Sequence, residues 1–112
     1  MRFPLEVAGI LRTHWPDDRP VFARISTTDW IDGGWTVENS VVYARELKSR
    51  GIDLVHCSSG GFDGAKLQVG ALYQVPFAER VRREAGVPTA AVGLITEPLE
   101  AESILTSGKA DV

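Results

Sequence analysis

The sequence predicts an α/β protein in which parallel strands alternate with helices. Short apolar runs at 21–26, 53–57 and 89–93 are separated by longer amphipathic stretches. The starts of these runs recur at spacings of roughly 20 to 36 residues, which is the scale of a βαβ unit. Strands that are apolar along their whole length are typical of parallel sheets covered by helices. An open doubly wound sheet and a (β/α)₈ barrel both satisfy this pattern, and a complete barrel needs about 250 residues, so this chain would make about half of one.

The helices follow from apolar residues spaced three and four positions apart. This spacing predicts helices over 3–13, over 37–50 after a Thr36 cap, over 74–85, and over 98–107 behind Pro98. Glycines directly after the last three stretches are helix stops. The final residues, 110–112, predict the beginning of a fourth strand.

The composition of the chain indicates which classes of binding partner and which compartment to expect. A net charge of -3 argues against nucleic acid. No apolar run approaches the roughly 20 residues of a membrane span, and the N-terminus has no signal-peptide core. The single cysteine, Cys57, indicates a reducing compartment, so we expect a cytoplasmic protein. Neither His14 nor His56 has further ligands at metal-binding spacing, so no metal site is predicted.

The first strand carries one guanidinium within an otherwise apolar run. Arg24 lies in Val21–Ser26, a run that predicts a strand covered on both faces. Burying this charge without a partner would cost several kcal/mol. Arg24 is therefore either paired by the protein, with Asp29 as the best candidate acid, or kept for a ligand.

Small and polar residues gather where the predicted strands end. Ser58 follows the second strand and Gly93 the third. The carboxyl ends of parallel strands form the edge where α/β folds bind ligands. Gly93 would let a phosphate approach backbone amides, although serine and glycine are also what βα turns need for their own geometry.

Other segments carry structural expectations. Trp30 and Trp35 lie in a polar, glycine-rich loop, and we expect their rings to pack on a hydrophobic edge. Cys57 is expected to be a small core residue. The stretch from Phe62 to Leu72 predicts an irregular segment of a length that is often functional.

Six segments in order resemble the old yellow enzyme family of FMN-dependent NADH:flavin oxidoreductases, in particular its bacterial xenobiotic and enoate reductase branch. They are Arg2–Val7, Val21–Ser26, Asp29-Trp30 with Gly33–Trp35, Gly51–Leu54 leading to Ser58–Gly61, Tyr73–Ala78, and Ala91–Thr96. Together they span nearly the whole chain.

The resemblance implies a single partial domain over 1–112, from the fourth helix through the start of the eighth strand of a (β/α)₈ barrel. It implies that Arg24 reaches the pyrimidine edge of FMN, where negative charge develops on reduction. It also implies that Ser58 lies near the ribityl-phosphate side and that Val92, Gly93 and Leu94 form half of the phosphate cradle.

The implied activity belongs to a longer protein. That protein would be an ene-reductase that moves hydride from NAD(P)H through FMN to the activated C=C of an enone or enoate. The family's catalytic groups lie upstream, so no catalytic residue is expected in this segment and the fragment alone is expected to be inactive. Its exposed barrel edges are expected to promote homo-oligomerisation. The alternatives are a barrel that binds a sugar phosphate or PLP, and a free-standing α/β binding module without catalysis.

Overall fold

The computed structural model describes residues 1–61 and 63–112, and within them four helices alternate with three strands. In chain order the elements are α1 (Arg2–His14), β1 (Phe22–Ser26), α2 (Val37–Ser49), β2 (Leu54–Ser58), α3 (Val75–Ala85), β3 (Thr89–Ala91) and α4 (Pro98–Thr106). Each coincides with an element that the sequence predicts. Phe62, where the expected irregular segment begins, lies outside the described residues.

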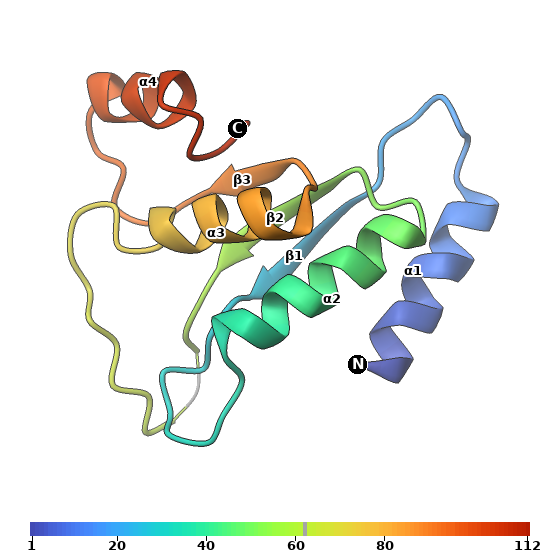
Figure 1. Ribbon diagram of the computed structural model, residues 1–112, viewed down its shortest axis with the longest axis horizontal. Helices are drawn as coiled ribbons and strands as arrows, with labels where there is room; N and C mark the ends of the chain where they lie inside the picture. Colours follow the sequence, from blue (N-terminus) through green and yellow to red (C-terminus); the bar gives the residue numbers. More distant parts are fainter. Residues whose placement is uncertain (62) are drawn as a thin grey trace.

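The three strands form a parallel sheet in the order β1-β2-β3, with α2 and α3 packed over one face (Figure 1). The α/β class is therefore confirmed, and the arrangement is consistent with part of a (β/α)₈ barrel. Beyond β3, the backbone N–H of Asp111 donates to the carbonyl of Thr89 at 2.8 Å, and that of Ala91 donates to Val112 at 2.9 Å. These bonds extend the sheet, as expected of a fourth strand that is beginning.

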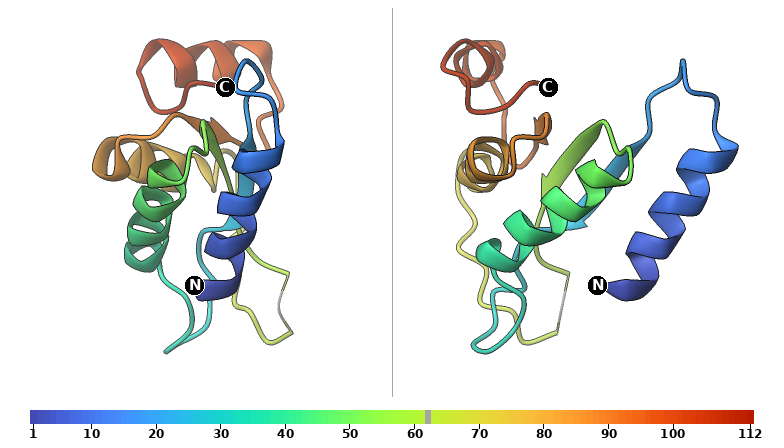
Figure 2. Two further views of the ribbon diagram at one scale, coloured as in Figure 1. Left: turned by 90° about the vertical axis from the view of Figure 1, so that its right-hand side faces the viewer. Right: turned by 45° about the vertical axis from the view of Figure 1, so that its right-hand side comes forward.

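The hydrophobic core lies between the sheet and these two helices. Val55 and Cys57 of β2 are fully buried together with Leu47 of α2 and Val81 of α3. Each large apolar side chain removed from water contributes about 1.5–3 kcal/mol, so this layer fixes the helices on the sheet. Figure 2 shows α1 beside α2, with α4 at the opposite end of the molecule.

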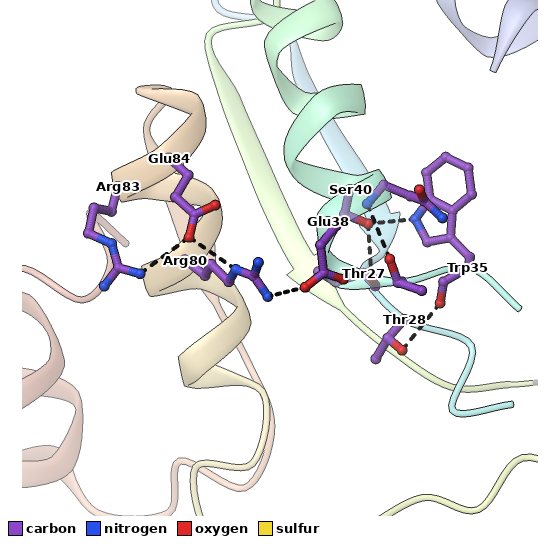
Figure 3. Close-up of polar contacts among 10 residues, drawn as sticks. Thr27, Thr28, Trp35, Glu38, Ser40, Arg80, Arg83 and Glu84 are labelled. Atoms are coloured by element: carbon purple, nitrogen blue, oxygen red, sulfur yellow. Dashed lines mark hydrogen bonds and ion pairs between the residues drawn. The ribbon is translucent and has the colours of Figure 1, made fainter. Parts of the chain in front are cut away.

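The helix ends and the tryptophan loop follow the sequence closely. The Thr36 hydroxyl accepts from the Asn39 N–H at 3.4 Å, which confirms the predicted cap of α2. The indole of Trp35 donates to the Ser40 hydroxyl at 2.6 Å (Figure 3). Trp30 packs edge-on against Phe77, with ring centroids 5.6 Å apart. The expectation that both rings pack on the protein is confirmed, since Trp35 also packs edge-on against a tyrosine of α2.

Candidate cofactor site

Arg24 and Ser58 are brought together at the carboxyl ends of β1 and β2. The register places Ser26 opposite Ser58 and Arg24 opposite His56, so all four side chains share one face of the sheet. Arg24 Nη2 donates to Ser58 Oγ at 3.0 Å. Two residues that the sequence placed on separate strands are therefore in direct contact.

The prediction that β1 is covered on both faces is wrong. Phe22 is 62% exposed, and Arg24 and Ser26 are exposed as well, whereas Ile25 is buried. The reason is that α2 and α3 lie on the side of Ile25. We call the side formed by Phe22, Arg24 and Ser26 of β1 with His56 and Ser58 of β2 the open face; Leu54, at the amino end of β2 on this side, is buried.

Asp29 does not neutralise Arg24. Its carboxylate Oδ2 accepts from the backbone N–H of Trp35 at 2.8 Å and so closes its own loop. Within residues 1–61 and 63–112, no Asp or Glu forms an ion pair with Arg24. Among the described side chains, its hydrogen-bond partner at the sheet edge is the neutral hydroxyl of Ser58.

Two cavities flank this guanidinium. One, of about 430 Å³, lies between Arg24, Trp35 and Tyr43. The other, of about 380 Å³, lies between Arg24, Ser58 and the glycines that follow β2. A ligand that filled either cavity would contact the guanidinium from a different side, so Arg24 lies at the junction of the two spaces.

The turn after β3 offers backbone donors. Gly93 has φ +112, which only glycine adopts readily, and Leu94 has φ +51. No atom of the described chain accepts a hydrogen bond from the N–H of Gly93 or Leu94. Since β3 adjoins β2, this turn with Val92 lies at the same edge as Ser58, one strand further along. Successive unpartnered N–H groups in such a turn suit an anion.

His56 also lies at this edge, opposite Arg24, although the sequence predicts no site role for it. Burial lowers the pKa of its imidazole, and the positive charge of Arg24 lowers it further, so both favour the neutral ring. His56 therefore adds a hydrogen-bonding ring beside Arg24 without adding charge. Cys57 faces the helices, and burial raises the pKa of its thiol to about 12, which confirms its expected role in the core.

Two further kinds of feature are absent from the described residues. No helix among them is long and apolar enough to cross a membrane. Nor does any group of three or more His, Cys, Asp or Glu side chains within them have the arrangement of a metal site.

Fold and site together define a parallel α/β unit with a cationic, amide-lined edge at the carboxyl ends of its strands. Sequence comparison gives the relatives of that unit. Over 111 residues the chain is 49% identical to the NADPH dehydrogenase of Geobacillus sp. (strain WCH70), a match that covers 99% of this chain and 32% of that protein. It is 40% identical to the NADPH dehydrogenase of Bacillus subtilis (strain 168), with the same coverage of each.

A third NADPH dehydrogenase, from Halalkalibacterium halodurans, is 42% identical over 107 residues, which are 96% of this chain and 31% of that protein. No protein-family model matches the chain. The resemblance to the old yellow enzyme family is thus confirmed by homologues named NADPH dehydrogenase. The chain spans about a third of the length of these relatives.

Proposed function

We propose that this chain supplies part of the FMN site of an NADPH dehydrogenase of the old yellow enzyme type. The observation that carries the proposal is Arg24, an exposed guanidinium without an acidic partner in the described chain, held by Ser58 at the carboxyl edge of the sheet. A fixed cation at such an edge suits a cofactor on which negative charge develops. The chain would then be a partial domain, from the fourth helix to the start of the eighth strand of a barrel.

The donor set suits FMN in two places. Arg24 and Ser58 offer a guanidinium and a hydroxyl to the polar pyrimidine edge and the ribityl chain. The turn of Val92, Gly93 and Leu94 offers backbone N–H groups to the phosphate. An anion at the N-terminus of α4 would meet the Glu100 carboxylate, which accepts from the N–H groups of Thr96 and Glu97 at 3.0 and 3.3 Å.

The residues of this chain would bind and polarise FMN rather than exchange protons with it. Ser58 accepts a hydrogen bond from Arg24 and so fixes the direction of the guanidinium. His56, being neutral, leaves Arg24 as the positive charge of the open face. Bound FMN would supply the hydride chemistry, taking hydride from NADPH and delivering it to the activated C=C of an enone or enoate.

The proposal extends to location and assembly. A single, buried cysteine supports a reducing compartment and hence the cytoplasm. β1 is an edge strand of the described sheet, and Phe22 is exposed on its open face; both features support association of this side with the rest of a longer chain or with a second copy.

The test uses a chimera in which residues 1–112 replace the matching segment of the Geobacillus relative. Arg24→Met should weaken FMN affinity about 10- to 100-fold and slow flavin reduction by NADPH, because a hydrogen bond to a charged group contributes about 1.5–3 kcal/mol. Arg83→Met is the matched control, since Arg83 is exposed on α3 and pairs with Glu84. Equal FMN affinity and reduction rates in both variants would refute the proposed role of Arg24.

A further inference from the structure

Gln74 is a buried polar residue that belongs to none of the strands. It lies directly before α3 and is only 3% exposed. We infer that Gln74 is a positioning residue, which locks the turn after β2 to the turn after β3 and so sets the geometry of the phosphate-binding amides. This inference rests on the proposed FMN site.

The side-chain amide of Gln74 uses each of its polar atoms on a different turn. Its Oε1 accepts from the Ser59 hydroxyl at 2.6 Å, and its Nε2 donates to the carbonyl of Val92 at 3.3 Å. Ser59 adjoins Ser58, and Val92 opens the turn that contains Gly93. One amide therefore spans the two turns to which we assign flavin binding.

The contact with the second turn is also a packing contact. A Cβ atom built on Gly93 would lie 2.6 Å from Nε2 of Gln74 and 2.8 Å from Cε1 of Tyr73. Any side chain at this position would therefore collide with Gln74, in addition to the strain of its φ of +112. The space that glycine leaves is filled by Gln74, which fixes the backbone of the turn from the protein side.

Gln74 is itself anchored. Its backbone carbonyl accepts from the N–H groups of Phe77 and Ala78, at 3.1 and 3.4 Å, so the residue is part of the first turn of α3. Val75 and Ala78 of that turn are buried in the core. Burying an amide is costly unless its hydrogen bonds are made, and an apolar side chain would fill the same space without that requirement. The two hydrogen bonds of Gln74 offset this cost and give the two turns a defined relative position.

The experiment compares FMN with riboflavin, which lacks the phosphate, in the same chimera. Gln74→Leu should lower the ratio of FMN affinity to riboflavin affinity by roughly tenfold or more, because displaced amides no longer converge on the phosphate. Gln68→Leu is the matched control, since Gln68 is exposed and the same substitution there should leave the ratio unchanged. A residue with only a structural role would weaken both flavins equally, and that result would overturn the inference.

Ser59→Ala keeps the test decisive if Gln74→Leu does not fold. It removes only the hydroxyl that donates to Gln74 and should lower the same ratio in the same direction, by less. An unchanged ratio in Ser59→Ala would contradict the inference. If instead the unsubstituted chimera bound riboflavin as tightly as FMN, the assignment of the phosphate to the turn after β3 would fail, a result distinct from failure of Gln74 alone.

Discussion

The two sides of the same short sheet have opposite environments. On one side Ile25, Val55 and Cys57 are buried under α2 and α3. On the other, Phe22 and Arg24 are exposed, although they alternate with Ile25 along five residues of one strand. The first side holds the fold together, and the second carries the charge and the hydroxyl groups. Stability and binding are thus assigned to opposite faces, and substitutions on each should have different consequences.

The largest expected effect is on the free energy of unfolding. It is tested by placing a carboxylate on each face of the sheet in turn. Val55→Asp in this chain should cost more than about 4 kcal/mol of unfolding free energy, because it buries an unpaired charge at a position that is 0% exposed. Phe22→Asp in the same chain should change that free energy by no more than about 0.5 kcal/mol. Urea unfolding followed by circular dichroism measures both.

The same pair of substitutions tests whether the open face becomes the inside of a barrel. In the chimera, where the rest of the relative surrounds the segment, Phe22→Asp should become strongly destabilising. A harmless Phe22→Asp in the chimera would contradict the partial barrel, and a damaging one in the isolated chain would contradict the exposure of Phe22.

A smaller effect is expected within the helix layer, where Arg80 of α3 joins Glu38 of α2 at 2.6 Å (Figure 3). The pKa of Glu38 is lowered to about 2, first by its own backbone N–H, then by the Thr36 hydroxyl and by Arg80. Because the pKa is lower in the folded state, the carboxylate stabilises the fold fully above its ordinary pKa of 4.5. That contribution is lost as pH falls toward about 2.

Thermal unfolding at a series of pH values measures this contribution. The Tm difference between the parent chain and Glu38→Gln should be present near neutral pH and should shrink as pH falls from about 4.5 to about 2. Glu102→Gln, on an exposed position of α4, serves as the control and should show no such trend. A Tm difference for Glu38→Gln that did not depend on pH would contradict a stabilising contribution from the charge of Glu38.

The helices and strands could be predicted from the sequence because local signals determine them. Apolar spacing placed α2 and α3, and Thr36 and Gly86 mark helix ends through their own backbone geometry. The prediction that both faces of β1 are covered is wrong, because an apolar run has the same sequence pattern whether one face or both faces of its strand are covered. Phe22 gives no local sign that its side chain is exposed on the open face.

The site could be predicted only in part, because contacts between distant residues depend on register. Arg24 and Ser58 were expected at one edge, but their hydrogen bond follows from the pairing of β1 with β2. Asp29 was the nearest acid in sequence, yet its own loop uses it. Gln74 was missed, since a glutamine at the start of a helix is ordinarily solvated, and only its burial reveals its two partners.

The most direct test of the central claim is hydrogen exchange of the chimera with and without FMN. The account predicts that FMN slows exchange at the amides of 58–61 and of Gly93 and Leu94; the N–H groups of Gly93 and Leu94 have no acceptor in the described chain. The amides of Gly86 and Val87, just before the amino end of β3, should exchange at the same rate in both states. Protection at Gly86 and Val87 with none at Gly93 and Leu94 would contradict the assignment of FMN to the carboxyl edge of this sheet.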